Sequence, residues 1–137
     1  MTAITGRLVV VLTVRDPDAS AAWYATLLDL QEHGRYVQPD GRVGQVDLLE
    51  PRSGLAICLV GHPANAGEAF SEFRTGLDHL EFLVAARSEL DAWAERLDTL
   101  GIDHSGVKEP AYTSNAMVTF RDPDNIQLEF FWPATTQ

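Results

Sequence analysis

Two stretches of the chain share one pattern, and that pattern decides the fold. Residues 12–30 read LTVRDPDASAAWYATLLDL, and residues 82–100 read FLVAARSELDAWAERLDTL. At a shift of 70 residues, Trp23 aligns with Trp93. Further identical pairs at this shift are Val14 with Val84, Leu27 with Leu97, and Leu30 with Leu100. Internal similarity of this kind indicates repeated structural units.

A second pair of segments continues the repeat. Residues 54–60 (GLAICLV) align with residues 125–131 (NIQLEFF) at a shift of 71 residues. The matches keep the same order along the chain, with one residue of slippage. We therefore expect a single domain built from two modules, residues 5–62 and 77–133, which are joined by residues 63–76.

Each module has the same predicted order of elements. A segment expected to form a strand opens it, at residues 8–14 and again at 77–84. A helix follows each segment, and three shorter strands follow each helix; in the second module the strands are expected at about 103–107, 116–121 and 126–132. The order is βαβββ, twice. Neither module alone would bury both faces of its sheet, so the two should share one architecture.

Residues typical of helix ends support the two helices. Asp16 is expected to cap the first helix, with Pro17 at its first position. Ser88 is expected to cap the second helix, and Gly101 is expected to end it.

The composition excludes several classes of protein. The 137 residues include 45% hydrophobic and 22% charged residues, which are ordinary values for a globular domain and exclude intrinsic disorder. The net charge is −10, and the sequence contains no cluster of Lys and Arg. Binding to nucleic acid is therefore not expected. The apolar run at residues 8–12 is too short to span a membrane, and Cys58 has no second cysteine to pair with. We expect a cytoplasmic protein.

Three motifs together resemble one superfamily. They are Asp16-Pro17 followed by Trp23-Tyr24, LDHLEFLV at residues 77–84, and RDPDNIQLEF at residues 121–130. With two βαβββ modules, they look like the vicinal oxygen chelate superfamily, which includes glyoxalase I, bleomycin-resistance proteins and extradiol dioxygenases. The resemblance implies an α+β fold in which two tandem modules form a half-barrel cup that holds a metal ion or a ligand. It also implies a homodimer.

The resemblance further implies four metal-ligand positions, two in each module. The second module supplies His79 on its first strand and Glu129 on its last. At the repeat shifts, the corresponding residues of the first module are Val9 and Cys58. Two of the four positions therefore keep good ligands. The sequence leaves two alternatives, a protein without a metal ion or one that binds a single divalent ion.

Strand alternation brings further polar side chains toward the cup. His79 and Glu81 share one face of their strand, and Gln127 and Glu129 share one face of theirs. One alternative is a site in which His79, Glu81 and Glu129 together hold a divalent ion. The other is a hydrogen bond between His79 and Glu129 without a metal ion.

Other residues are candidates for the wall of a ligand pocket. Aromatic side chains suit flat organic ligands, and the loops at residues 34–45 and 108–115 would set specificity. The candidate ligand-binding residues are Tyr112, Gln127, Phe131, Trp132, Val9 and Cys58.

Two functions follow, from different classes. The first is a binding protein that sequesters an aromatic or cationic, antibiotic-like small molecule without a complete metal site. The alternative is a divalent-metal-dependent enzyme, a lyase, isomerase or dioxygenase, with His79 and Glu129 as ligands and with Glu81 or Glu129 in catalysis. A metal-free enzyme that uses Glu129 or His79 as general base, and an accessory subunit whose cup a partner closes, are further alternatives.

Overall fold

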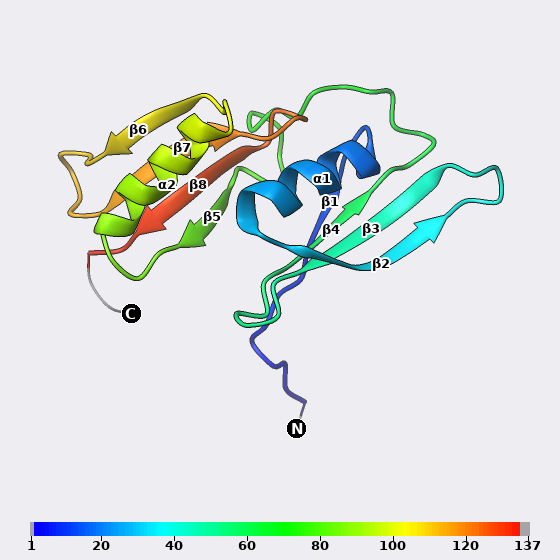
Figure 1. Ribbon diagram of the computed structural model, residues 1–137, viewed down its shortest axis with the longest axis horizontal. Coiled ribbons are helices and arrows are strands. Elements are labelled where there is room, and N and C mark those ends of the chain that lie inside the picture. Colours follow the sequence, from blue (N-terminus) through cyan, green and yellow to red (C-terminus); the bar gives the residue numbers. More distant parts are fainter. Residues whose placement is uncertain (1, 135–137) are drawn as a thin grey trace. The chain divides into compact units, whose positions relative to one another are not determined.

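The computed structural model describes residues 2–134. They divide into two compact units, one ending at Glu68 and one beginning at Ala69 (Figure 1). Each unit has the element order strand, helix, strand, strand, strand. The predicted α+β fold of two βαβββ repeats is therefore confirmed. Within the described residues, no helix combines the length and apolar character needed to cross a membrane.

In the first unit, one helix packs against a four-stranded sheet. The elements are β1 (Val10–Thr13), α1 (Pro17–Leu28), β2 (Gln31–Val37), β3 (Val43–Leu49) and β4 (Ala56–Val60). The strands lie in the order β1-β4-β3-β2, with β1 parallel to β4 and the other neighbours antiparallel. The prediction of a loop at residues 34–45 is wrong in part, because β2 continues to Val37 and β3 begins at Val43.

The second unit repeats this architecture. Its elements are β5 (Leu80–Leu83), α2 (Ser88–Thr99), β6 (His104–Lys108), β7 (Ala116–Arg121) and β8 (Gln127–Trp132). The strand order is β5-β8-β7-β6, and β5 runs parallel to β8.

The strand register gives an independent check on the repeat. In the first unit Val11 pairs with Cys58, and in the second unit Glu81 pairs with Glu129. These partners differ by 70 residues on the first strand and by 71 on the last, which are the shifts found in the sequence. The repeat is therefore structural, and equivalent positions in the two units can be compared directly.

The two helices begin in different ways. The Asp16 carboxylate accepts a hydrogen bond from the Ala19 N–H at 3.1 Å, so the predicted cap of α1 is confirmed. The predicted Ser88 cap is wrong, because Ser88 is already the first residue of α2 and Arg87 precedes it without a side-chain cap. The Glu89 carboxylate instead accepts the N–H groups of Ala85 and Ala86, at 2.9 and 3.0 Å.

One face of each sheet is apolar and packs under its helix. In the second unit the Trp93 indole of α2 stacks on Phe130 of β8, with ring centroids 4.1 Å apart. Leu128 and Phe130 are buried on this face. Because strand residues alternate between faces, Gln127, Glu129 and Phe131 lie on the opposite face. The helix therefore fixes which face carries the polar side chains.

Candidate functional site

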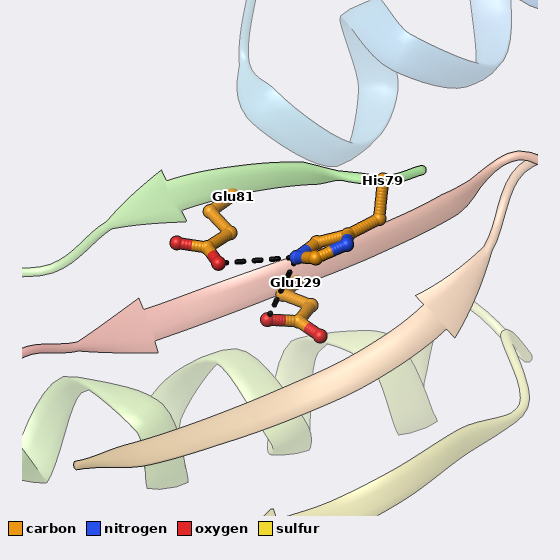
Figure 2. Close-up of side chains that lie close together, drawn as sticks. All are labelled: His79, Glu81 and Glu129. Carbon is orange, nitrogen blue, oxygen red and sulfur yellow. Dashed lines mark hydrogen bonds and ion pairs between the residues drawn. The ribbon is translucent and has the colours of Figure 1, made fainter. Parts of the chain in front are cut away.

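Three ligand-type side chains of the second unit converge at the paired strands β5 and β8 (Figure 2). His79 directly precedes β5, Glu81 lies on β5, and Glu129 lies beside it on β8. The His79 Nε2 atom is 3.0 Å from Oε1 of Glu81 and 3.6 Å from Oε2 of Glu129. One donor atom from each residue lies within 4.8 Å of the others, which brings together the three side chains that the sequence placed on one face.

The imidazole of His79 is held from both sides. Its Nδ1 atom lies 2.6 Å from Oδ1 of Asp78, while Nε2 faces the two glutamates. A carboxylate on one ring nitrogen fixes the tautomer and leaves the other nitrogen as the ligand atom, an arrangement common around metal-bound histidines. Burial on its own lowers the pKa of His79, but the hydrogen bonds to Asp78 and Glu81 outweigh it, and the pKa is raised.

Glu129 is the most buried member of the cluster. Its side chain is 8% exposed, against 39% for Glu81. The Gln127 amide donates a hydrogen bond to Oε1 of Glu129 at 3.1 Å, which leaves Oε2 toward His79. Burial raises the pKa of Glu129, and the neighbouring Glu81 raises it further, against the opposing effect of His79.

The donor set fits a divalent cation. One imidazole nitrogen and two carboxylates are ligands that suit Mn(II), Fe(II), Zn(II) and similar ions. The carboxylates of Asp78, Glu81 and Glu129 surround a single imidazole, so the cluster carries excess negative charge even when His79 is protonated. A cation would relieve this repulsion, and the outer contacts of Asp78 and Gln127 would hold the ligand atoms in place.

The first unit carries a different set at the equivalent positions. Val9 precedes β1 and is 60% exposed, and Val11 on β1 is 58% exposed. Cys58 on β4 lies opposite Asp47 of β3. Burial raises the pKa of the Cys58 thiol to about 11, and its hydrogen bond to Asp47 contributes. The side chains of Val9 and Val11 carry no ligand atoms, so no ligand set equivalent to that of the second unit forms here.

The remaining candidate residues are spread over the second unit. Gln127 contacts the Glu129 carboxylate, as described above. Phe131 pairs with Leu83 of β5 and Met117 of β7, and Trp132 pairs with Ala116 at the end of β8. Tyr112 lies in the loop between β6 and β7 and is 90% exposed.

Sequence reasoning missed Asp78 as a partner of the site. The signal that could have found it is its position directly before His79, since an Asp beside a candidate ligand is a candidate to hold the imidazole. Sequence reasoning also missed Asp47 as the neighbour of Cys58, because finding it requires the pairing of β3 with β4.

A cavity of about 440 Å³ lies elsewhere, within the first unit. It is formed at the start of α1 and by the loop after β4, and Arg15, Arg42 and His62 are among its lining residues. None of the candidate metal-ligand, catalytic or ligand-binding residues named from the sequence lines it, although Asp16 and Pro17 of the helix start do. The cluster of ligand-type side chains and this cavity are therefore separate features.

Comparison with known proteins places this chain in a family. The model of the Glyoxalase/Bleomycin resistance protein/Dioxygenase superfamily matches residues 7–130. Among proteins with curated descriptions, none matches the chain significantly.

Several solved structures are similar over nearly the whole chain. A glyoxylase/bleomycin resistance protein/dioxygenase domain from Frankia sp. EAN1pec is 35% identical, with 98% of this chain and 96% of that chain covered and a TM-score of 0.81. The fosfomycin resistance protein FosX from Listeria monocytogenes, in complex with Mn(II) and sulfate, is 20% identical, with 97% and 95% covered and a TM-score of 0.67. A glyoxalase family protein from Enterococcus faecalis is 21% identical, with 93% and 98% covered and a TM-score of 0.73. The last two similarities concern the fold. The resemblance seen in the sequence motifs is confirmed: the chain belongs to the Glyoxalase/Bleomycin resistance protein/Dioxygenase superfamily.

Proposed function

We propose that this protein binds one divalent cation through His79, Glu81 and Glu129 and acts on a small organic molecule that presents oxygen atoms to that cation. The observation that carries the proposal is the convergence of the three ligand-type side chains, with donor atoms within 4.8 Å of one another. Of the alternatives raised by the sequence, this one is the metal-dependent enzyme, with Glu81 as a third ligand that offsets the ligands missing from the first unit.

The contacts of His79 favour a bound cation over a metal-free histidine–glutamate pair. In a metal-free pair, His79 Nε2 should make its closest contact with Glu129. Glu81 lies nearer, at 3.0 Å against 3.6 Å, and Asp78 occupies the other ring nitrogen. The carboxylates of Asp78, Glu81 and Glu129 repel one another, and a single imidazolium does not balance three negative charges. A bound cation would supply the additional positive charge.

The roles of the residues follow from their positions. A divalent ion bound here would supply Lewis-acid chemistry, polarising oxygen atoms of the bound molecule. With the ion bound through Nε2, Asp78 would hold the proton on Nδ1 of His79, and the Gln127 contact would leave Oε2 of Glu129 toward the site. Glu81 is the most exposed of the three ligands, so its second carboxylate oxygen is placed to take a proton from a bound molecule or return one.

Calorimetric titration of the metal-free protein with Mn(II) and Zn(II) tests the proposal. Mn(II) is the first ion to use, because a protein of the same fold was crystallised with it. We expect about one ion per chain and loss of the binding heat in the Glu129→Ala variant. Wild-type protein that gives no heat with either ion, and that elutes free of metal after desalting from a metal-supplemented buffer, would contradict the proposal.

A second candidate function is the capture of an aromatic or cationic small molecule without a metal ion. The observation that favours it is the apolar character of the first unit, where Val9 and Val11 are exposed at the positions of His79 and Glu81. Quenching of tryptophan fluorescence by cationic aromatic antibiotics would test it. Quenching that saturates equally in wild type and in Glu129→Ala would favour capture over the metal site.

The assembly and cellular location proposed for the protein are those expected from the sequence, a homodimer in the cytoplasm. β1 and β5 are each an outer strand of their sheet, and this supports pairing because the edge of an outer strand can accept a further strand. Sedimentation equilibrium would give the mass of the particle in solution, and a monomer at all concentrations would contradict the dimer.

A further inference from the structure

We propose that Gln127 and Arg121 are positioning residues of the cation site: Arg121, anchored by Glu72, sets the orientation of the Gln127 amide, and that amide directs Glu129 toward His79. This inference rests on the proposed cation site and adds residues that touch neither the ion nor a bound molecule. It comes from a continuous chain of side-chain contacts within the second unit.

The first step of the chain is the amide of Gln127, which has two different neighbours. Its Nε2 donates to Oε1 of Glu129 at 3.1 Å, and its Oε1 accepts from Nη2 of Arg121 at 3.3 Å. The opposite amide orientation would place the carbonyl oxygen against the Glu129 carboxylate and the NH2 group against the guanidinium. Both contacts would then be repulsive, so Arg121 leaves a single favourable orientation.

The second step is the anchoring of Arg121. Its guanidinium contacts both oxygens of Glu72, at 2.9 and 3.1 Å, and also donates to the Asn125 carbonyl at 3.0 Å. Two parallel hydrogen bonds of this kind fix the plane of the guanidinium as well as its position. The pKa of the Glu72 carboxyl is lowered to about 2 by its hydrogen bond with Arg121, so the pair stays charged at neutral pH.

The third step is the effect on Glu129. Because Oε1 of Glu129 is occupied by the Gln127 amide, Oε2 is the oxygen left for the cluster, where it faces His79. His79 is held in a comparable way by Asp78 on its far side. The buried Glu129 and the half-buried His79 thus have outer partners that fix their orientation, whereas the more exposed Glu81 contacts His79 directly.

A double-mutant cycle on the full chain tests the inference. The Mn(II) affinity is measured by calorimetry for wild type, Gln127→Met, Arg121→Met and the double variant, with thermal unfolding of each as a check on folding. Outer-shell substitutions of this kind weaken metal binding about 10- to 100-fold. If Arg121 acts through Gln127, the double variant should bind no more weakly than Gln127→Met alone, because the two effects share one route.

The matched control is Arg87→Met. Arg87 makes a comparable contact with a carboxylate, its Nε donating to Glu109 at 2.6 Å, but it is outside this chain of contacts. Its removal should leave the Mn(II) affinity unchanged. If Arg121→Met does not fold, Gln127→Met carries the test, since it leaves the contact between Arg121 and Glu72 in place.

The NMR signals of the Gln127 side-chain NH2 group give a readout that needs no metal. In the metal-free protein they should shift on Arg121→Met and stay in place on Arg87→Met. Equal Mn(II) affinity in wild type and Gln127→Met, or additive losses in the cycle, would overturn the positioning role. Absence of Mn(II) binding in wild type would instead contradict the proposed cation site, while the NMR shift would still decide whether Arg121 orients Gln127.

Discussion

The two units pair their first and last strands in the same register, yet they place opposite chemistry there. In the first unit the register brings Val11 beside Cys58, and in the second it brings Glu81 beside Glu129. Both sheets form and both carry a helix on one face. The polar cluster is therefore not needed to build a βαβββ unit.

The difference extends to the residues around these positions. Asp78, which holds His79, corresponds to Leu8 at the repeat shift, and Leu8 is 89% exposed. Gln127, which holds Glu129, corresponds to Ala56. The second unit thus has both the proposed ligands and their outer partners, and the equivalent positions of the first unit have neither. We therefore expect cation binding to depend on the second unit.

The largest effect is expected when the most buried ligand is removed. Glu129→Ala should weaken Mn(II) binding by more than about 100-fold, because a lost ligand costs more than a lost outer partner. The fold should remain, since Glu129 lies on the face opposite the apolar core. Calorimetry and thermal unfolding check both statements. Cys58→Ala, at the equivalent position of the first unit, is the matched control and should bind Mn(II) as wild type does.

Copying the site into the first unit tests whether the difference between the two units lies in these side chains alone. The substitutions are Val9→His, Val11→Glu, Cys58→Glu and Asp47→Thr; the last is included because Thr119 pairs with Glu129 where Asp47 pairs with Cys58. We expect the Mn(II) stoichiometry to rise from about one to about two ions per chain. The new site should be about 10- to 100-fold weaker than the native one, because Leu8 and Ala56 do not replace Asp78 and Gln127. A folded variant with unchanged stoichiometry would show that equal register is not sufficient.

A smaller effect is expected from the residue that holds His79. Asp78→Asn should weaken Mn(II) binding about tenfold, since the imidazole loses the charged acceptor that fixes its tautomer. Asp98→Asn is the matched control, because Asp98 makes a similar contact with Nε2 of His104, at 2.7 Å, outside the cluster. Equal losses in both variants would indicate a general charge effect rather than a specific orientation of His79.

The smallest effect concerns the thiol of the first unit. The pKa of Cys58 is raised to about 11, so the thiol stays protonated at neutral pH and should react slowly with iodoacetamide until the pH approaches that value. Asp47→Asn should lower the pKa, because it removes the negative charge and carboxylate acceptor, and alkylation at pH 9 should become faster. A rate profile with an unchanged midpoint would show that burial alone sets the pKa.

The fold was open to prediction from the sequence because its signals are local and occur twice. Asp16 and Pro17 begin a helix in both the sequence pattern and the structure. The turn before β8 is marked by Asp122, whose carboxylate accepts the N–H groups of Asp124 and Ile126. Such turns and caps depend on neighbouring residues, which a sequence displays directly.

The site was predictable only in part, because its details depend on side-chain contacts between strands. Alternation along β5 and β8 placed His79, Glu81 and Glu129 on one face, and the structure brings their donor atoms together. The roles of Asp78 and of the chain from Glu72 to Gln127 depend on rotamers and on a contact 49 residues apart. The predicted Ser88 cap was wrong although its signal is local, because the neighbouring Glu89 accepts the N–H groups of Ala85 and Ala86 instead.

The most direct test of the central claim is anomalous scattering from crystals grown with Mn(II). We expect a strong anomalous peak within bonding distance of His79 Nε2 and of the Glu81 and Glu129 carboxylates, with none at Cys58. A well-ordered structure without a peak at these residues, or with the ion bound instead between Cys58 and Asp47, would contradict it.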